Sequence, residues 1–483
     1  MGPVITRIIN SPAWRNVERY GSLFPSRPFG NMSTQQVSFE QLPVLDTLVD
    51  KLLATRQAPL NKTAVVYIHH SLRTSLTLLD ALLKLGLKPK NTYVLGKHYS
   101  ENRAVVEEAR KRGVYYQPCS AQVGLGRFNS SFIRDINWLW SHAVKQLEGD
   151  SDVENVLILD HGGYAINFVP STIVNKFNVI GLEKTASGLV NLQRQGGIPS
   201  FPLINVANCV AKKVLESPLI AEAVVTKLSP VIPLAQQRTT CGVIGYGAIG
   251  KAIADKLLSL GHKVVVYDSD PTQLKTTMHH KDFITTTDLG SVVNFADLIF
   301  GCTGQDVTVS SEAFRISPRD KTLISCSTED REFLTLLNLA QKKYKGKASV
   351  DPLKDVIYEN DFGSKIKILR GGFPYNFDDS GESVPANDIQ LTRALVLAGV
   401  FHALDLFSKQ TLLGYGEIYA LDAGLQQFVV RDWLKYQPTG RHAASVLANF
   451  DSMAWIKTHS PGIHEQLTLN LGLSANTFTL KNT

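Results

Sequence analysis

The sequence lacks the features that mark membrane-spanning, disulfide-stabilised and nucleic-acid-binding chains. No apolar run approaches the roughly 18 residues that a membrane span requires, so no membrane partner is expected. The five cysteines include no CxxC pair, which favours reduced thiols in a cytoplasmic protein. The formal net charge is +7, but lysine and arginine form only short pairs. We therefore expect neither a nucleic-acid partner nor a metal site.

Residues 1–35 differ in composition from the rest of the chain. They hold four arginines against a single acid, Glu18, and they show no clear periodicity. We interpret them as a flexible arm, or as an extension that precedes a start at Met32. A targeting segment is the alternative, although such a segment is typically a cleaner amphipathic helix.

From about Ser38, apolar runs of strand length alternate with helix-length amphipathic stretches. The expected strands of the first half are Ala64–Ile68, Tyr93–Leu95, Val114–Tyr116, Val156–Leu159, Val179–Leu182 and Leu203–Val206. Those of the second half are Gly242–Gly245, Lys263–Tyr267, Leu298–Cys302, Leu323–Cys326 and Ile366–Leu369. This alternation predicts an α/β fold with two doubly wound parallel sheets, each covered by helices on both faces.

The prolines of Lys227–Gln237 indicate the boundary between the two sheets. We predict a substrate and catalytic domain at residues 36–227 and a second domain at 228–385. A long apolar helix, Leu391–Leu406, then carries a C-terminal segment (386–483) back to the first domain, where it helps oligomerisation. The expected assembly is a homodimer or homotetramer.

The most informative motif is Cys241–Asp270, which reads CGVIGYGAIGKAIADKLLSLGHKVVVYDSD. A strand leads into three spaced glycines, a helix follows, and a second strand ends at Asp268. Gly245 makes a tight turn, Gly247 lets the backbone approach a pyrophosphate, and Gly250 lets helix and strand pack closely. The strand, turn, helix and terminal acid together predict a Rossmann dinucleotide-binding domain.

The same motif predicts which dinucleotide is bound and which groups contact it. Ala248 and Ile249 begin the helix, whose free amides and partial positive charge suit the pyrophosphate. Asp268 would bond the ribose hydroxyls and repel a 2′-phosphate, which favours NAD over NADP. Thr303 and Gly304, in the segment GCTG after a later strand, are expected to line the nicotinamide site; a simple turn is the alternative.

An ordered series of further segments resembles the S-adenosylhomocysteine hydrolase family. The series consists of YIHHSLRT (67–74), LILDHGG (157–163), GLEKTASGLVNL (181–192), PLINVANCVAKK (202–213), the glycine turn and GGFPYNF (371–377). It covers roughly Ala64 to Asn376. The resemblance implies two domains and a permanently bound NAD that transiently oxidises a ribose hydroxyl before a thiol leaves and water adds.

The resemblance also assigns roles to individual residues. It places His69 near the leaving group and Lys212 at the hydroxyl that is oxidised, with Glu216 in place of an aspartate beside it. Thr185, Ser187 and Asn376 fall on positions near the nicotinamide end of the cofactor. A lysine beside a carboxylate can be tuned to accept a hydroxyl proton, and an imidazole is the natural group to move protons near pH 7.

Several positions depart from the family pattern, and they predict a different substrate. His161 replaces an essential aspartate, and it could serve as a substitute acid or base or have no chemical role. Lys184 replaces a glutamate that should bind the ribose, and Arg73 replaces a glutamate that should read the adenine. With Ser71 and Asp160, these two cations are the expected substrate-binding residues. Charge reversal in a closed site predicts a small, more anionic substrate.

Three functions follow. The first is an NAD-dependent enzyme of this superfamily that oxidises a hydroxyl of an anionic or nucleoside-like small molecule. The second is an inactive NAD-binding or nucleoside-binding regulator or scaffold, which the lost carboxylates favour. The third is a 2-hydroxyacid dehydrogenase, which would need an arginine and a Glu–His pair that Thr328, Glu329 and Asp330 do not supply.

Overall fold

The computed structural model describes residues 40–119, 128–195, 197, 199–275, 281–309, 312–343, 351–378, 380–409 and 416–437. All of these residues belong to one compact unit, Phe39–Thr483. The N-terminal arm expected at residues 1–35 and the last part of the C-terminal segment lie outside the described residues.

The first sheet has the strand order β14-β6-β5-β4-β1-β2-β3, and every neighbouring pair is parallel. Its strands are β1 (Thr63–His69), β2 (Thr92–Gly96), β3 (Tyr115–Tyr116), β4 (Asn155–Asp160), β5 (Asn178–Glu183), β6 (Leu203–Asn205) and β14 (Ile418–Ala420). The strand order reverses between β1 and β4, so the loops after these two strands flank a crevice at the carboxyl edge.

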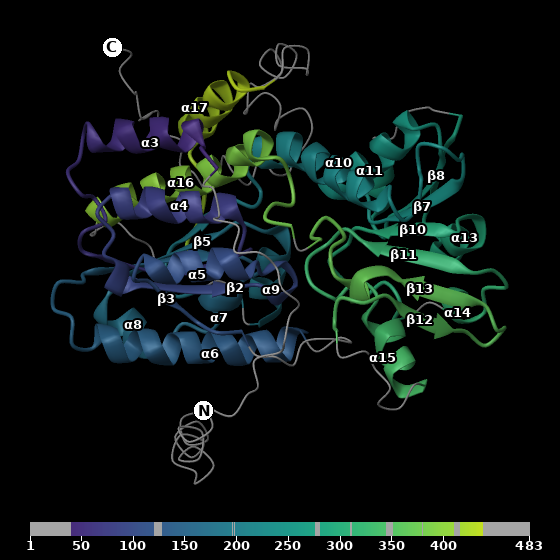
Figure 1. Cartoon of the computed structure of the whole chain (residues 1–483), viewed down its shortest axis with the longest axis horizontal. Coiled ribbons are helices and arrows are strands. Elements are labelled where there is room, and N and C mark those ends of the chain that lie inside the picture. Colours follow the sequence, from purple (N-terminus) through teal and green to yellow (C-terminus); the bar gives the residue numbers. More distant parts are fainter. Residues whose placement is uncertain are drawn as a thin grey trace, which may run out of the picture. The chain divides into compact units, whose positions relative to one another are not determined.

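Two helical layers cover the first sheet (Figure 1). One layer contains α3 (Pro43–Leu53), α4 (Arg73–Lys84), α5 (Arg103–Lys111), α16 (Ala386–Ser408) and α17 (Ala423–Leu434). The other contains α6 (Phe128–Leu147), α7 (Tyr164–Asn167), α8 (Ser171–Lys176) and α9 (Ala186–Gln195). Val65 and Tyr67 of β1 enter the first core while Val66 and Ile68 enter the second, because alternate residues of a strand face opposite sides.

The second sheet has the order β12-β13-β11-β10-β7-β8-β9. Its strands are β7 (Thr240–Ile244), β8 (Lys263–Tyr267), β9 (Phe283–Thr286), β10 (Leu298–Gly301), β11 (Lys321–Ser325), β12 (Val356–Glu359) and β13 (Lys365–Ile368). From β9 to β13 this is the order 3-2-1-4-5-6 of a Rossmann fold, with β12 added antiparallel at one edge. The predicted fold class is therefore confirmed.

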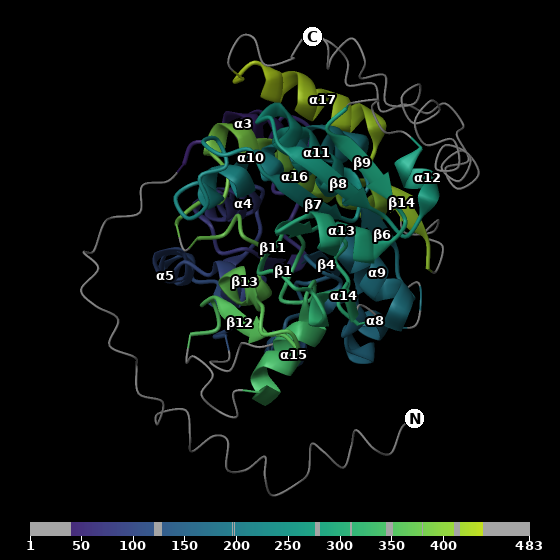
Figure 2. The same ribbon diagram turned by 90° about the vertical axis from the view of Figure 1, so that its right-hand side faces the viewer.

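Helices also cover both faces of this sheet (Figure 2). On one face lie α10 (Ser217–Leu228) and α11 (Ala248–Ser259); on the other lie α13 (Leu289–Phe295), α14 (Glu312–Arg315) and α15 (Leu334–Lys343). The short α12 (Pro271–Leu274) follows β8. Remaining turns are η1 (Pro89–Asn91), η2 (His98–Ser100), the π-helical η3 (Lys212–Glu216) and η4 (Leu369–Gly372).

The sequence pattern misses three strands: β9, β12 and β14. All three lie at sheet edges and are short, and their side chains are half-buried or exposed except for Tyr358. An edge strand lacks the continuous apolar run that marks a strand buried on both faces.

The expectation that no segment reaches membrane-spanning length is wrong for α16. Among the described residues, this 23-residue helix is long and apolar enough by length and composition, with a mean hydropathy of 1.4. However, 78% of the apolar window is buried inside the protein, where α16 packs on α3, α4, β5 and β6. Its apolar character therefore serves the core of the first sheet.

Candidate functional site

The carboxyl edges of the two sheets are joined by direct polar contacts. Lys97, just after β2, lies with its Nζ 3.2 Å from Glu329 Oε1, in the loop after β11, and both side chains are buried. The Tyr99 hydroxyl lies 3.2 Å from Thr328 Oγ1, and Arg331 donates to Asn191 Oδ1 at 2.9 Å. The loops that follow the parallel strands of both sheets therefore meet, which is where ligands bind in such folds.

The glycine turn after β7 has the geometry that the sequence predicts. Gly245 adopts φ +93°, and its amide donates to the Tyr267 carbonyl at the end of β8. A Cβ on Gly250 would lie 1.8 Å from the Gly245 carbonyl oxygen, so this position excludes any side chain. Asp268 accepts hydrogen bonds from the backbone amides of Tyr246 (2.6 Å) and Asp270 (2.8 Å), which hold its carboxylate beside the turn.

Two other glycines leave the space that a dinucleotide needs. A Cβ on Gly247 or on Gly304 would meet nothing within 4 Å. Gly247 caps α11, whose first residue, Ala248, is exposed, and Ile249 is half-buried. The free amides of this first turn face open space, as a pyrophosphate requires. The residues present therefore fit an NAD(P) cofactor.

Glu332 fixes the turn after β10 that is expected to line the nicotinamide site. The buried carboxylate accepts from the amide and hydroxyl of Thr303, at 2.8 and 2.7 Å, and from the amide of Gly304 at 2.8 Å. It also accepts from the Ser327 hydroxyl. Burial raises the pKa of Glu332, which these hydrogen bonds counteract. Thr303 and Gly304 thus belong to a rigid loop beside the Gly245 turn.

His69 is the last residue of β1 and His161 follows β4, on either side of the switch point of the first sheet. His69 is buried, its Nε2 lies 3.3 Å from the Tyr116 hydroxyl, and its ring stacks on Tyr67 at 4.5 Å. Burial, helped by Lys184, lowers the pKa of His69 well below its usual value. His69 is therefore a neutral imidazole at pH 7.

His161 contacts a second histidine, His70, which lies in the segment YIHHSLRT but to which the sequence assigns no role. Its Nε2 lies 3.1 Å from Nε2 of His70, whose Nδ1 lies 2.5 Å from the Ser100 hydroxyl. Burial, followed by the neighbouring His70, lowers the pKa of His161; burial and Lys97 do the same for His70. Both rings are therefore neutral at pH 7, so that in this contact the Nε2–H of one ring donates to the Nε2 of the other.

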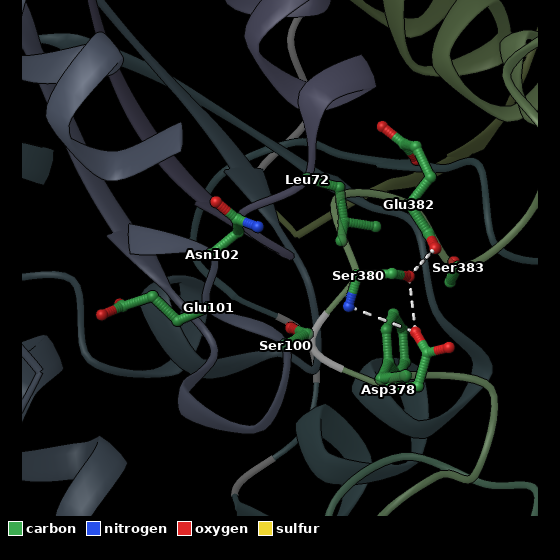
Figure 3. A pocket seen from close by; sticks show the side chains of 9 residues that line it. Leu72, Ser100, Glu101, Asn102, Asp378, Ser380, Glu382 and Ser383 are labelled. Carbon is green, nitrogen blue, oxygen red and sulfur yellow. Dashed lines mark hydrogen bonds between the residues drawn. The ribbon is translucent and has the colours of Figure 1, made fainter. Parts of the chain in front are cut away.

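A shallow hollow with no enclosed space for a water molecule lies next to this histidine pair, and Figure 3 shows residues that line it. Ser100, the partner of His70, lies in its wall, and so does Phe377, whose ring stacks on His70 at 4.2 Å. Leu72 and Asn102 line the side that belongs to the first sheet, and Glu382 lies opposite. The hollow therefore contacts, through Ser100 and Phe377, the chain of groups that ends at His161.

Lys184 is buried immediately after β5. Its Nζ donates to the Ile68 carbonyl at 3.0 Å and lies 4.9 Å from the centre of the Tyr67 ring. Burial, followed by Arg393, lowers the pKa of Lys184 well below its usual value. Asp160, at the end of β4, lies nearby, and burial together with Glu183 raises its pKa to about 7.

Lys212 and Glu216 form an ion pair of 2.7 Å on η3, after β6. Glu216 also accepts from the Thr392 hydroxyl of α16 at 2.9 Å. The pair that the resemblance assigns to catalysis is thus held by a helix from the C-terminal part of the chain.

The other predicted residues have varied surroundings. Thr185 donates through its amide and its hydroxyl to Glu183, and Ser187 lies 3.4 Å from the Thr185 hydroxyl. Ser71 bonds the Tyr116 hydroxyl, and Asn376 is buried. Arg73 is 38% exposed and lies 3.7 Å from Glu40, so it stands at the surface.

Arg393 is the residue that sequence analysis missed. It is 6% exposed on α16, and its Nε donates to the Thr74 hydroxyl at 3.1 Å. It lies close enough to Lys184 and His69 to lower the pKa of both. A charged residue inside a long apolar helix was the available signal, because arginine is seldom buried without a partner.

Comparison with known proteins supports the Rossmann unit. A family profile described as NADP oxidoreductase, coenzyme F420-dependent, matches residues 240–329. The uncharacterized protein Rv0104 of Mycobacterium tuberculosis is 30% identical over 378 residues, which cover 78% of this chain and 71% of that protein. The chain belongs to the same family as Rv0104. Strand order and profile together identify this member as a dinucleotide-binding, oxidoreductase-like protein.

More distant similarities are partial. An adenosylhomocysteinase of Thermoplasma volcanium is 22% identical over 244 residues, which cover 50% of this chain and 58% of that enzyme. A D-isomer specific 2-hydroxyacid dehydrogenase from Lactobacillus delbrueckii, solved with NAD, is 13% identical with a TM-score of 0.35, over 72% of this chain and 98% of that one. The latter score is too low to bear on function.

Proposed function

We propose that this protein is an NAD-dependent enzyme that oxidises a hydroxyl group of a small anionic or nucleoside-like substrate, transiently or as net hydride transfer. The observation that carries the proposal is the meeting of the two carboxyl edges through Lys97 and Glu329. It brings the loop after β11 of the nucleotide-binding sheet against the first sheet, whose edge carries His69, His161 and Lys184.

The choice of NAD over NADP rests on Asp268. Its carboxylate is held at the end of β8 by two backbone amides, and no arginine adjoins it in the sequence. A fixed negative charge at this point accepts hydrogen bonds from ribose hydroxyls and disfavours a phosphate.

The proposed chemistry divides between the cofactor and the chain's own residues. NAD, when bound, supplies hydride acceptance from the carbon that carries the hydroxyl. We assign the transfer of the hydroxyl proton to Lys212, and its 2.7 Å ion pair with Glu216 supports a role of this pair in moving that proton. His161 and His69 are neutral and can each accept a proton, and the His161–His70–Ser100 chain leads from the buried edge toward the hollow of Figure 3.

The first experiment is to identify the ligands of the purified full-length protein by mass spectrometry. The proposal expects NAD, and it expects absorbance in the NADH band when a suitable nucleoside or hydroxy acid is added. Absence of nicotinamide, with no binding of added NAD or NADP, would overturn it. Bound NAD without reduction by any of these substrates would support the inactive regulator instead.

A second candidate is net oxidation of a 2-hydroxy acid. The buried Lys184 favours it, because a carboxylate-bearing substrate would use that cation whereas the adenosylhomocysteinase pattern has a glutamate there. The two candidates differ in product: net oxidation accumulates NADH and a keto acid, whereas transient oxidation leaves NAD unchanged after each turnover.

A further inference from the structure

Two buried cations at the carboxyl edge of the first sheet have no carboxylate partner. Lys184 is 3% exposed and Arg393 is 6% exposed. Within the described residues neither forms an ion pair: Lys184 Nζ donates to the Ile68 carbonyl and Arg393 Nε donates to the Thr74 hydroxyl. Lysine and arginine are almost never this deeply buried unless they are paired.

Lys184 contacts an aromatic ring on which Arg393 also acts electrostatically. Lys184 Nζ lies 4.9 Å from the centre of the Tyr67 ring, and His69 stacks on that ring at 4.5 Å. Arg393 acts electrostatically on Tyr67, on His69 and on Lys184. In addition, His69 Nδ1 is buried and forms no side-chain hydrogen bond in the described part of the chain; burial lowers the pKa of His69, and a hydrogen bond with the backbone of His70 opposes this shift. Two cations and a ring nitrogen without a side-chain partner therefore gather at one place.

The acids nearest to this place are occupied elsewhere. Glu183 accepts hydrogen bonds from the amides of Gly162, Gly163 and Thr185 and from the Thr185 hydroxyl. Asp160 accepts from the amides of His161 and Ile166. Glu382 binds the amide and hydroxyl of Thr74, and Glu216 is paired with Lys212. None of these carboxylates is within ion-pair distance of Lys184 or Arg393, although Glu183 and Asp160 act electrostatically on Lys184, and Arg393 acts on Glu382.

We infer that Lys184 and Arg393, with His69, form a subsite for an oxyanion, a carboxylate or phosphate group carried by the substrate. Arg393 offers a planar fork of donors and Lys184 a point charge, a combination that suits either group. An anion seated here would restore the charged form of Lys184, which burial and Arg393 disfavour. The inference rests on the proposed function, because it names the substrate class of the same site.

The test measures anion binding by the full-length, NAD-loaded protein. Inorganic phosphate and glycolate are titrated at constant ionic strength against chloride, and binding is followed by calorimetry and by the thermal unfolding midpoint. We expect at least one of the two anions to bind. Preference for phosphate or for glycolate then tells whether the substrate carries a phosphate or a carboxylate.

Variants locate the subsite. Arg393→Gln and Lys184→Met should each weaken anion binding at least about tenfold, since each removes a buried charge that faces the ligand. Arg103→Gln is the matched control, because it removes an exposed arginine that is paired with Glu107 on α5, and it should change nothing. No binding beyond chloride, or equal binding by all four proteins, would overturn the inference.

Two further measurements keep the result interpretable. If Arg393→Gln does not fold, a crystal structure of the natural protein soaked in the binding anion decides: its oxygens must contact both Lys184 and Arg393, and contact with neither overturns the inference. NAD content is measured in the same samples. Anion binding that persists in protein unable to bind nicotinamide would overturn the proposed function and leave the subsite standing.

Discussion

The carboxyl edges of the two sheets are built in different ways. At the second edge, the turn from Gly245 to Gly250 and the acid Asp268 come from a single stretch of chain and contact one another through backbone amides. At the first edge, His69, Lys184 and Arg393 come from segments more than 100 residues apart. Local backbone geometry fixes the nucleotide turn of the second edge, whereas the first edge is formed by the packing of charged side chains that are distant in the sequence.

This difference separates what the family of Rv0104 shares with many nucleotide-binding proteins from what is particular to it. A dinucleotide turn needs small residues and free amides, and these requirements are similar for every substrate. Under the proposed function, the first edge contacts the substrate itself. Its buried cations and neutral histidines would then determine specificity.

The largest expected effect concerns the ion pair that joins the two edges. Replacing Lys97 by methionine removes the cation 3.2 Å from the buried Glu329, which keeps Arg331 at 2.8 Å as its remaining ion-pair partner. We therefore expect the free energy of unfolding to fall by about 3 kcal/mol, the lower end of the range for breaking a buried ion pair. Lys62→Met is the matched control, because Lys62 pairs with Glu154 while both are more than half exposed; its loss should not exceed about 1 kcal/mol. Urea unfolding measures both. Equal losses would show that the edges are not held by this pair.

The next effect isolates the glycine turn. Gly250→Ala places a methyl group 1.8 Å from the Gly245 carbonyl oxygen, so the turn must open. We expect NAD binding to weaken by about 100-fold, which corresponds to roughly 2.7 kcal/mol. Gly149→Ala introduces the same methyl group where nothing lies within 4 Å and should leave binding unchanged. Calorimetric titration with NAD measures both affinities. Equal affinity of the two variants for NAD would contradict the assignment of the Gly250 turn to NAD binding.

The contrast between the edges also explains what the sequence could predict. The glycine spacing and Asp268 are read directly, because the strand, turn and helix that they specify are contiguous. The strands buried on both faces are found for the same reason, whereas the short edge strand β14 is not.

At the first edge, the positions of His69 and His161 are predictable, because His69 ends strand β1 and His161 follows strand β4. Arg393 is not, since nothing local indicates which face of α16 turns toward Lys184. Arg73 was the cation expected to help bind the substrate. In the structure, the side chain of Arg73 lies at the surface, 3.7 Å from Glu40. This orientation depends on tertiary packing and cannot be predicted from the neighbouring sequence.

A smaller effect is the pH dependence of stability that the histidines of the first edge impose. His69, His70 and His161 have pKa values well below 6.5 when folded, so below that pH the unfolded chain binds more protons. Their contribution is present above about pH 6.5 and is lost as the pH falls, by up to about 1.4 kcal/mol per pH unit for each histidine.

Asp160 acts in the opposite direction. Its pKa of about 7 lets the folded state hold a proton that the unfolded state releases above its ordinary pKa, so this single term loses stability as the pH rises. The three histidines outweigh it. Below pH 6.5, His70→Gln should reduce the slope of the free energy of unfolding against pH by about 1.4 kcal/mol per pH unit, which corresponds to one proton. An unchanged slope would show that His70 is charged in the folded protein.

The smallest expected effect tests the cofactor preference at the second edge. Asp268→Asn keeps an acceptor for the Tyr246 amide and removes the charge that would repel a 2′-phosphate. We expect the ratio of NADP to NAD affinity to rise about tenfold, or roughly 1.4 kcal/mol. Asp270→Asn removes the same charge from an exposed carboxylate that caps α12 and should leave the ratio unchanged. If both variants shifted the ratio equally, the preference would come from the net charge of the loop; a shift confined to Asp268 would show that the second edge selects its ligand through one locally held side chain.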